Sequence, residues 1–212
     1  MLELGLKTLL AYLLGAVLGS LVMGRFRGVD IREQGSGNAG GTNALRTQGW
    51  KFALGVVVID VGKALLAVGL LPGLSLPLVG IDPAVGRDWL TVACATAVVV
   101  GHVYPVWYEF RGGKGAATLV GAVAMLAPAA LLPVIVVWLA TVMLTGFVGL
   151  GTVLGTATLP VYFALGEPRA APFIVFGLVM AAFVAYTHRE NIGRMRAGNE
   201  NRARRLWLLR PR

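Results

Sequence analysis

Between two long apolar segments lies the polar run Gly35-Ser36-Gly37-Asn38-Ala39-Gly40-Gly41-Thr42-Asn43. Glycine tolerates positive φ and lets other backbone approach closely, so successive N–H groups of such a run can converge on one anion. Arg27, Arg32 and Arg46 flank the run, and their guanidinium groups suit bidentate contact with a phosphate. A flexible linker is the alternative interpretation. Two later interruptions of similar chemistry favour a phosphate-binding loop.

The composition indicates a membrane protein. Of the 212 residues, 57% are hydrophobic and 14% are charged, whereas a soluble domain carries about 25% charged residues. The net charge of +9 would indicate nucleic acid in a soluble protein. Here we interpret it as cytoplasmic loops facing anionic headgroups or substrates, and we expect no nucleic-acid partner. Cys94 is the single cysteine, which rules out a disulfide within the chain and predicts a buried thiol.

Glycine, proline and charge divide the apolar sequence into segments near the length of a spanning helix, which is about 20 residues. We predict an all-α integral membrane protein with about seven spans, and six or eight would also fit. The expected spans are 4–23, 50–71, 88–104, two within 116–145 separated near Pro128 and Pro133, 153–165 and 171–187. The first segment has no small-residue cleavage site before Arg25, so we expect it to stay in the membrane.

We expect a single domain over residues 1–212, with polar connections between the spans. These are loops at about 25–49, 105–115 and 145–152, an exposed turn at 166–169 and a basic tail at 188–212. Lysine and arginine gather in the first loop, the second loop and the tail, while the alternate side has only Lys7, Arg87 and Arg169. The positive-inside rule then places the N-terminus outside, the C-terminus in the cytoplasm and every glycine-rich stretch on the cytoplasmic face.

The second polar interruption ends in Gly112-Gly113-Lys114-Gly115, immediately before an apolar helix. Backbone amides at a helix N-terminus, together with a lysine, can hold a phosphate. The stretch is not a nucleotide-binding Walker loop, because Gly115 follows the lysine where serine or threonine is required. A simple cytoplasmic turn is the alternative. Tyr104, Trp107 and Phe110 precede it and indicate an interfacial aromatic belt.

The third polar interruption, residues 188–200, follows the last expected span. His188 and Asn191 are three residues apart, so they share a face if the helix continues. Both side chains can bind an oxygen-rich ligand. A solvated basic tail that meets anionic lipid is the alternative for this stretch, and it is the interpretation that we favour beyond Arg202.

Together, the three stretches resemble the bacterial acyl-phosphate:glycerol-3-phosphate acyltransferases. The resemblance rests on residues 27–32 with 35–43, on 101–115 and on 188–200, and it extends over essentially the whole chain. It implies an enzyme of the bacterial cytoplasmic (inner) membrane, with seven spans and no cofactor or metal. The chain departs from the family pattern at Gly149, where the turn is usually richer in serine, and Thr152 is the remaining hydroxyl there.

The resemblance also implies a reaction and partners. A fatty acyl group passes from acyl phosphate to the 1-hydroxyl of sn-glycerol 3-phosphate, which gives lysophosphatidic acid and phosphate for phospholipid synthesis. Because acyl phosphate is already activated, no nucleophilic serine or nucleotide is needed. The expected partners are these two substrates and membrane lipids. The oligomeric state is left open, and a monomer is compatible with the sequence.

The family pattern assigns roles to residues of all three stretches. The residues expected in catalysis are Ser36, Asn38, His188 and Asn191. The residues expected to bind substrate are Arg46, Thr42, Asn43, Gly112, Gly113, Lys114, Gly115 and Thr152. Amides of the three glycines would cradle the acyl phosphate, and Asn38 or Thr42 could stabilise the oxyanion. His188 could be the general base, but a substrate phosphate oxygen would serve equally well and would leave His188 as a binding residue.

Two charged residues fall inside the second expected span. Asp60 and Lys63 are spaced to pair on one helical face, and Gly62 suggests a close helix approach. We favour a structural clamp over a catalytic role. A transporter of an anionic small molecule is the alternative function from another class, although no internal repeat supports it. A scaffold with a basic tail would leave the 35–43 run unexplained.

Overall fold

All regular elements in the part of the chain that the structure describes are helical. The computed structural model describes residues 1–77, 79–166 and 171–209, and no β-strand occurs among them. The all-helical class predicted from the sequence is therefore confirmed. The chain divides into two compact units, Met1–Leu126 and Ala127–Arg212, and each is described by itself. The turn expected at 166–169 lies, beyond Gly166, outside the described residues.

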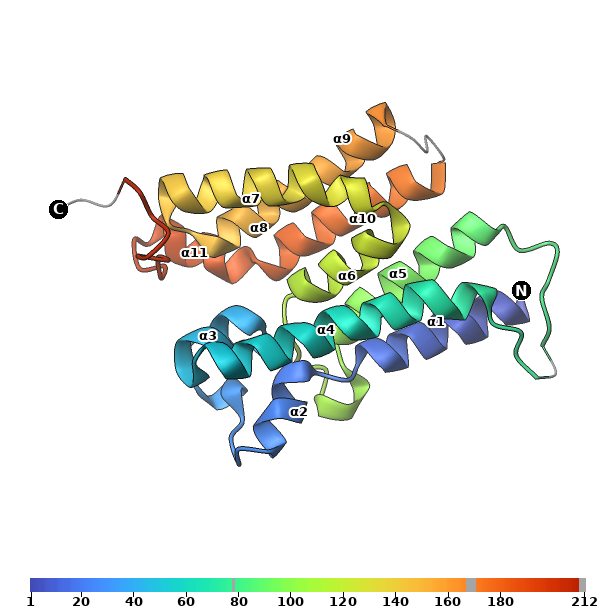
Figure 1. The fold of residues 1–212 in the computed structure, drawn as a ribbon, viewed down its shortest axis with the longest axis horizontal. Helices are drawn as coiled ribbons and strands as arrows, with labels where there is room; N and C mark the ends of the chain where they lie inside the picture. The colour runs from blue at the N-terminus through green and yellow to red at the C-terminus, as the bar shows by residue number, and fades with distance from the viewer. Residues whose placement is uncertain (78, 167–170, 210–212) are drawn as a thin grey trace. The chain divides into compact units, whose positions relative to one another are not determined.

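The first unit contains six α-helices in its described residues. They are α1 (Leu2–Gly15), α2 (Gly19–Arg25), α3 (Gly41–Gln48), α4 (Trp50–Leu70), α5 (Arg87–Val103) and α6 (Ala116–Leu126). Helix α1 packs along α5, and α4 packs against α6 (Figure 1). The 21-residue helix α4 has α3 and the glycine-rich loop at its N-terminal end and the loop 71–86 at its C-terminal end.

Glycines let the helices of this unit approach backbone to backbone. A Cβ at Gly15 of α1 would collide with the carbonyl oxygen of Val98, and one at Gly101 of α5 would collide with that of Tyr12. Such small-residue contacts are typical of helix packing in membranes, where dispersion contacts replace the hydrophobic driving force. The close approach expected at Gly62 is wrong, because a Cβ there would meet nothing within 4 Å.

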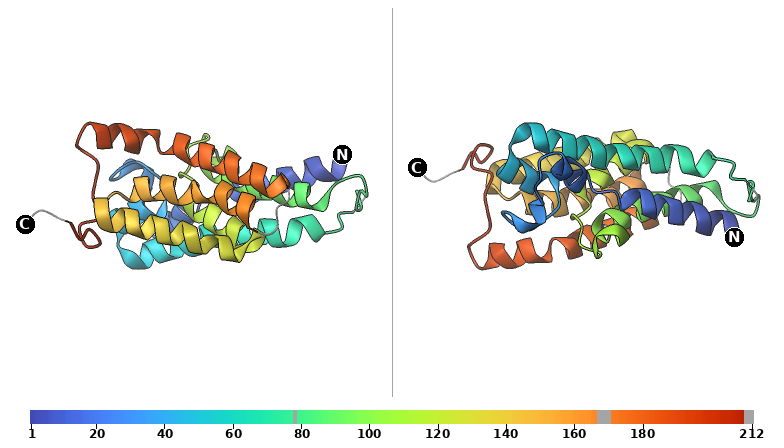
Figure 2. Two further views of the ribbon diagram at one scale, coloured as in Figure 1. Left: turned by 90° about the horizontal axis from the view of Figure 1, so that it is seen from above. Right: turned by 90° about the horizontal axis from the view of Figure 1, so that it is seen from below.

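The second unit is built from α7 (Leu131–Thr145), α8 (Val148–Thr156), α9 (Thr158–Leu165), α10 (Ala171–Thr187) and α11 (Arg189–Arg196). Helix α8 lies beside α7 and α10 (Figure 2), and α9 packs on α10. A 3-10 turn at Pro128–Ala130 precedes α7, so the helix break expected near Pro128 is confirmed. Pro133 is accommodated in the first turn of α7, where its missing N–H costs no helical hydrogen bond.

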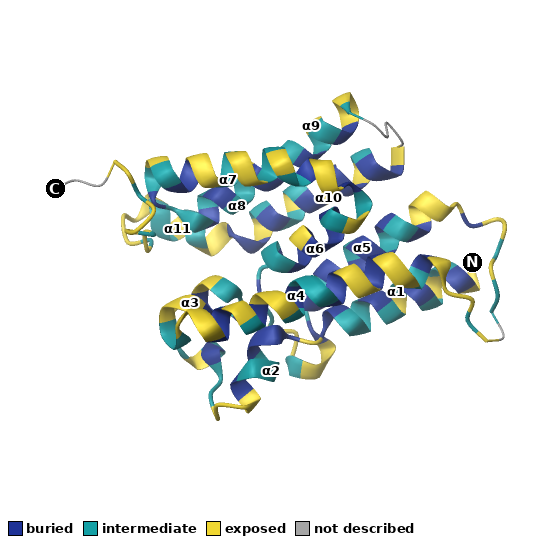
Figure 3. Ribbon diagram, in the orientation of Figure 1, coloured by how far each residue is buried: buried dark blue, intermediate teal, exposed yellow. Residues whose placement is uncertain are grey.

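Among the residues that the structure describes, four helical stretches are long and apolar enough to cross a bilayer, and there are up to six if two bent pairs each form one span. The bent pairs are α1 with α2, at 45°, and α10 with α11, at 51°. Helix α6 is apolar but has only 11 residues. Large apolar side chains are exposed along α4 and α7 (Figure 3), as expected for surfaces that face lipid. Each expected span coincides with a helix or helix pair, while the count of seven remains a prediction.

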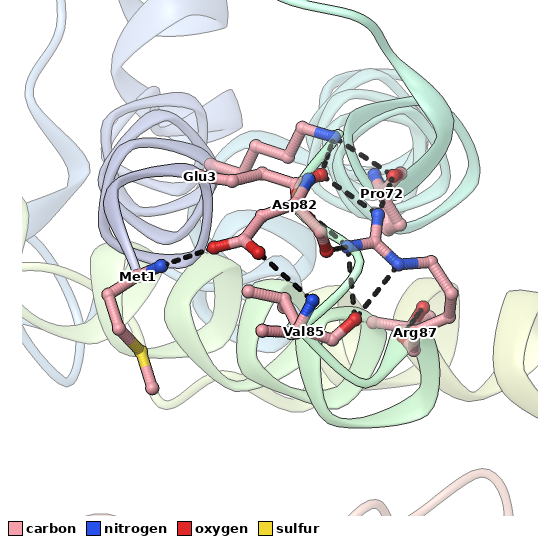
Figure 4. A network of polar contacts seen from close by, with 9 residues as sticks. Met1, Glu3, Pro72, Asp82, Val85 and Arg87 are labelled. Atoms are coloured by element: carbon pink, nitrogen blue, oxygen red, sulfur yellow. Dashed lines mark hydrogen bonds and ion pairs between the residues drawn. The ribbon is translucent and has the colours of Figure 1, made fainter. Parts of the chain in front are cut away.

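A buried ion cluster lies at the C-terminal end of α4, away from the glycine-rich loop. The side chains of Glu3 and Lys7 have no exposed surface. Lys7 Nζ lies 2.7 Å from Glu3 Oε1 and 3.0 Å from the carbonyl oxygen of Pro72. The Arg87 guanidinium contacts both carboxylate oxygens of Glu3, at 2.8 and 2.7 Å (Figure 4). The pairing satisfies charges that would otherwise be costly to bury.

The same cluster fastens Asp82, in the connection between α4 and α5, to the start of α1. The backbone N–H of Asp82 donates to Glu3 Oε2 at 2.8 Å, and the Asp82 carboxylate accepts from the Met1 ammonium at 2.6 Å (Figure 4). This ammonium holds the pKa of the Asp82 carboxyl below its usual value. The cluster therefore joins the start of α1, the start of α5 and the Pro72 and Asp82 parts of the α4–α5 connection at this end of the unit.

Candidate active site

Asn43 organises the glycine-rich loop from its centre. Its side chain is 1% exposed. The amide nitrogen Nδ2 donates to the carbonyls of Ile31, Gln34 and Asn38 at 2.9, 2.9 and 3.0 Å, and Oδ1 accepts from the backbone N–H of Ser36 at 3.0 Å. One side chain thus replaces the backbone pairing that an irregular loop lacks. The loop is a built structure, and the flexible-linker interpretation is wrong.

Two glycines of the loop are required by this arrangement. Gly35 has φ +59°, and a Cβ there would collide with Asn43 Oδ1. Gly37 has φ +71°, in the left-handed region that residues with a Cβ rarely adopt. The two glycines therefore allow the chain to fold back over the Asn43 amide.

The loop presents polar groups at the start of α3. Ser36 and Thr42 are exposed and Asn38 is half-buried, and the side chains of these residues make no hydrogen bond with any described residue. No described side chain caps the first turn of α3, whose amides carry the positive end of the helix dipole. Arg46 is exposed in the last turn and makes no ion pair within the described residues. These groups suit an anionic ligand.

Arg32 joins the first polar loop to the second. Its guanidinium is paired with Asp30, with 2.6 Å between Nη2 and Oδ2. Nη1 lies 3.4 Å from the carbonyl oxygens of Tyr108 and Arg111, and the guanidinium carbon lies 5.8 Å from the centre of the Tyr108 ring. Hydrogen bonds from Arg32 hold the pKa of the Asp30 carboxyl below its usual value. The loops at 25–49 and 105–115, which are far apart in sequence, therefore lie together.

The Gly112-Gly113-Lys114-Gly115 stretch is folded back on the end of α5. The amides of Gly112 and Gly113 donate to the carbonyls of Val103 and His102, both at 3.1 Å. A Cβ at Gly113 would collide with His102 Nε2. The role expected for these two amides, to cradle acyl phosphate, therefore needs correction, because both are already hydrogen-bonded. The two glycines instead allow close approach, and they place Lys114, which is half-buried, and Gly115, where φ is +86°, at the start of α6.

A buried cluster of three charged or polar side chains, Asp60, Lys63 and His102, packs against this stretch through His102. Lys63 Nζ lies 3.1 Å from Asp60 Oδ1 and 2.9 Å from His102 Nδ1, and it donates to the carbonyls of Gly15 and Val17 at 2.8 and 2.7 Å. The expected Asp60–Lys63 pair is confirmed. His102 Nδ1 also lies 3.4 Å from Asp60 Oδ1, and its Nε2 faces Gly113, so the imidazole ring connects the ion pair to the lysine-bearing stretch.

The same cluster explains the break between α1 and α2. The carbonyls of Gly15 and Val17 point to Lys63 instead of continuing the helix, and the backbone N–H of Gly19 donates to Asp60 Oδ1 at 3.0 Å. The first expected span is thus a helix pair held at its break by charged residues of α4. The cluster joins α1, α2, α4, α5 and, through His102, the lysine-bearing stretch.

In the second unit, His188 and Asn191 lie at the junction of α10 and α11. The helix does not continue straight through His188, because the two helices meet at 51° and His188 is the N-cap of α11. His188 is 5% exposed, and its Nδ1 lies 2.8 Å from the carbonyl oxygen of Val184. Since a carbonyl only accepts, Nδ1 carries a hydrogen, and Nε2 is the acceptor nitrogen of the neutral ring.

Glu200 holds Asn191 and the end of α11 in place. Its Oε1 accepts from Asn191 Nδ2 at 2.6 Å, and its Oε2 accepts from Arg194 Nε at 2.6 Å. The loop expected at 145–152 is wrong beyond Phe147, because α8 begins at Val148 and contains both Gly149 and Thr152. A Cβ added to Gly149 would lie 3.1 Å from Asn191 Nδ2, so this part of α8 lies against Asn191. Thr152 is half-buried, and its hydroxyl donates to the carbonyl of Val148 at 3.0 Å within α8.

Comparison with known sequences decides the family. The sequence profile of the family described as "Glycerol-3-phosphate acyltransferase" matches residues 6–198. This chain belongs to the glycerol-3-phosphate acyltransferase family. It is therefore an acyltransferase, as the three stretches indicated. The matched range includes every residue expected in catalysis or substrate binding, while Glu200 lies just beyond it.

Relatives and solved structures agree with that placement. The glycerol-3-phosphate acyltransferases of Chlorobaculum parvum and Desulforamulus reducens are each 37% identical to this acyltransferase, with 91% and 90% of the chain and 93% and 90% of the relatives covered. Crystal structures of PlsY, an integral membrane glycerol 3-phosphate acyltransferase, are 31% identical over 94% of both chains. The TM-scores are 0.79 for its glycerol 3-phosphate form and 0.77 for its lysophosphatidic acid form.

Three supporting residues were missed at the sequence level. His102 and Glu200 were noted only as parts of polar stretches, and Arg32 only as a flanking cation. A histidine one residue before the end of α5 and a carboxylate nine residues after Asn191 carry no periodic signal. The roles of His102 and Glu200 become visible only in the folded structure, where each contacts a residue from another part of the chain.

Proposed function

We propose that this acyltransferase moves a fatty acyl group from acyl phosphate to the 1-hydroxyl of sn-glycerol 3-phosphate, with lysophosphatidic acid and phosphate as products. The observation that carries the proposal is a pair of glycine-rich loops, fastened to each other by Arg32, that expose Ser36 near the uncapped start of α3, whose last turn carries the exposed Arg46. The family match adds support, because PlsY, a relative, is described in glycerol 3-phosphate and lysophosphatidic acid forms.

The proposed reaction is a direct acyl transfer. The hydroxyl oxygen forms a bond to the acyl carbon, the bond from that carbon to the phosphate oxygen breaks, and phosphate leaves with the bonding electrons. The hydroxyl proton passes to a base. Asn38, which is half-buried, and Thr42, which is exposed, have side chains that can donate to the oxyanion, and one well-placed donor contributes about 3–4 kcal/mol.

The phosphate groups of the two substrates need positively charged or hydrogen-bond-donating partners. We assign Arg46, Lys114 and His188 to glycerol 3-phosphate, with Ser36 and Asn191 orienting its hydroxyls. The Gly115 amide remains the candidate for the acyl phosphate, since the amides of Gly112 and Gly113 are used in the loop. Asn43 acts as a positioning residue, because its whole side-chain amide is hydrogen-bonded within the loop. Thr152 is kept as a substrate-binding candidate by the family pattern alone, because its hydroxyl donates to the Val148 carbonyl within α8.

We assign His188 to binding and the base to a substrate phosphate oxygen. The Val184 carbonyl accepts from Nδ1, so the ring presents Nε2 either as a lone pair or, when protonated, as a donor to phosphate. Asn191, three residues further along, is an amide held by Glu200, and an amide does not stabilise a cationic imidazole as the orienting carboxylate of a catalytic base does.

We also propose seven spans in the bacterial cytoplasmic membrane, with the N-terminus outside, the C-terminus in the cytoplasm and the active site at the cytoplasmic face. In the first unit, the glycine-rich loop and the Glu3–Arg87 cluster lie at opposite ends of α4. A helix of this length spans about 30 Å, which is about the thickness of the hydrocarbon core. The positive-inside rule supports the direction.

The proposal is tested by identifying the product. Purified protein in detergent micelles is given acyl phosphate and isotopically labelled glycerol 3-phosphate, and the lipid fraction is analysed by mass spectrometry. We expect labelled lysophosphatidic acid and an equal amount of released phosphate. Arg46→Ala should raise the half-saturating glycerol 3-phosphate concentration by about 10-fold or more, whereas Lys51→Ala, at an exposed cation of α4, should not. Phosphate release without labelled lipid would contradict the proposal.

A further inference from the structure

The segment 202–209 lies beyond residue 198, where the family match ends, and it is docked on the end of α7. Four successive carbonyls accept hydrogen bonds from it. The Met143 carbonyl accepts from Leu208 N at 2.9 Å, and the Leu144 carbonyl accepts from Trp207 Nε1 at 3.1 Å. The Thr145 carbonyl accepts from Arg202 Nη1 at 3.1 Å, and the Gly146 carbonyl accepts from Ala203 N at 2.7 Å. The last carbonyls of a helix have no intrahelical partner, so this segment caps α7.

Aromatic stacking fixes the docked segment further. The guanidinium carbon of Arg202 lies 4.4 Å from the centre of the Phe147 ring and 4.1 Å from that of Trp207. A cation between two aromatic faces is held by both ring quadrupoles. Gly146, with φ +77°, is needed at this point, because a Cβ there would lie 3.2 Å from the Trp207 ring.

The remaining side chains of the segment face away from the protein. Arg204 and Arg205 are exposed, and Leu206, Leu208 and Leu209 are 44%, 68% and 64% exposed. Exposed leucines beside arginines, with a tryptophan, are typical of segments that lie in the interface of a bilayer. Here they are held at the end of α7, which together with the preceding 3-10 turn forms the stretch Pro128–Thr145 that is long and apolar enough to span the membrane.

We propose that the segment 202–209 is a membrane-surface anchor that binds anionic lipid headgroups through Arg204 and Arg205. Its leucines enter the interfacial layer, and its docked side caps α7 next to the turn before α8. The positive charge selects an anionic surface, and the exposed leucines favour a lipid surface over a soluble acidic partner. The inference rests on the membrane placement proposed above, but its test does not depend on acyl transfer.

The test measures amide hydrogen exchange in the full chain, in nanodiscs of phosphatidylcholine alone or mixed with phosphatidylglycerol. The Ala203 and Leu208 amides report docking, because both donate to carbonyls at the end of α7. We expect roughly tenfold slower exchange of these amides in the anionic discs, from two cations near the charged surface, and loss of the difference at high salt. The double variant Arg204→Gln/Arg205→Gln should lose it, and Arg25→Gln, at an exposed cation of α2, should keep it.

Equal exchange in both kinds of disc, with the α10 amides protected as usual, would overturn the inference. An equal loss in Arg25→Gln would also overturn it, because the effect would then follow net charge and not this segment. Slower exchange on addition of an acidic peptide, with no response to phosphatidylglycerol, would assign the segment to a protein partner instead. Loss of acyl transfer with the lipid response intact would count against the proposed function alone.

Discussion

The side-chain oxygen of Asn43 lies 3.0 Å from the backbone nitrogen of Ser36 and accepts its hydrogen bond. A residue on α3 therefore fixes the position of an exposed hydroxyl seven residues earlier in the chain. The Nδ2 atom of the same side chain donates to three further carbonyls of the loop. Asn43 thus connects the fold of the loop to the placement of the groups that it exposes.

We expect Asn43→Ala to lower turnover by at least 10²-fold and to reduce the free energy of unfolding by about 1–3 kcal/mol, because several buried polar groups lose their partner. Asn199→Ala, at an exposed asparagine, is the matched control and should change neither. Thermal unfolding and steady-state kinetics measure the two effects. Normal turnover in Asn43→Ala would show that the loop keeps its shape without this side chain.

The Arg32–Asp30 pair should respond to acid in a defined direction. The pKa of the Asp30 carboxyl is lowered in the folded protein, so the pair stabilises the fold above the unfolded value, about 3.9, and that stability is lost as the pH falls through the folded value. Arg32→Gln should therefore be less stable than the parent at neutral pH, and the difference between their melting temperatures should disappear below about pH 4. Melting temperatures across pH measure this. A gap that persists unchanged in acid would exclude the pair as its source.

The Asp60–Lys63–His102 cluster should act as a structural clamp. Lys63→Met leaves the buried Asp60 without its cation and should cost about 3–5 kcal/mol of unfolding free energy. The double variant Asp60→Asn/Lys63→Met removes both charges and should recover much of that loss. In both variants, the folded fraction should keep its pH profile of turnover. A double variant that is stable but has strongly reduced turnover, with an altered pH profile of that turnover, would instead indicate a catalytic role.

The fold class and the approximate place of the apolar helices follow from the sequence, because long apolar segments and their glycine and proline boundaries have a clear local signal. The polar helices α3 and α11 and the start of α8 do not, because they fall in stretches expected to be loops or tail. The Asp60–Lys63 pair also follows, since it obeys helical spacing. The break at 16–18 does not, because those residues are apolar and the break is made by Lys63 from another helix.

Part of the candidate site was likewise inaccessible from the sequence. Glycines are compatible with both positive φ and close approach, so the pattern cannot tell whether Gly112 and Gly113 offer their amides to a ligand or use them within the loop. The structure shows the second case. Asn43 bonds to backbone groups earlier in the chain, and Glu200 bonds to the Asn191 side chain. Neither kind of contact produces a periodic pattern in the sequence.

His188→Asn should separate binding from proton transfer, because asparagine keeps a donor but cannot act as a base. We expect turnover near that of the parent at saturating glycerol 3-phosphate, with a raised half-saturating concentration. Steady-state kinetics in both substrates measure this. A loss of about 10²-fold or more in turnover at an unchanged half-saturating concentration would assign the general base to His188.

The central claim is direct transfer from acyl phosphate, and donor choice tests it most directly. Purified protein with glycerol 3-phosphate is given either acyl phosphate or acyl-coenzyme A of the same chain length, without nucleotide or added metal, and lysophosphatidic acid is measured in both cases. We predict rapid product formation with acyl phosphate, unchanged by a chelator, and little with the thioester. Equal or faster turnover of acyl-coenzyme A would contradict the account.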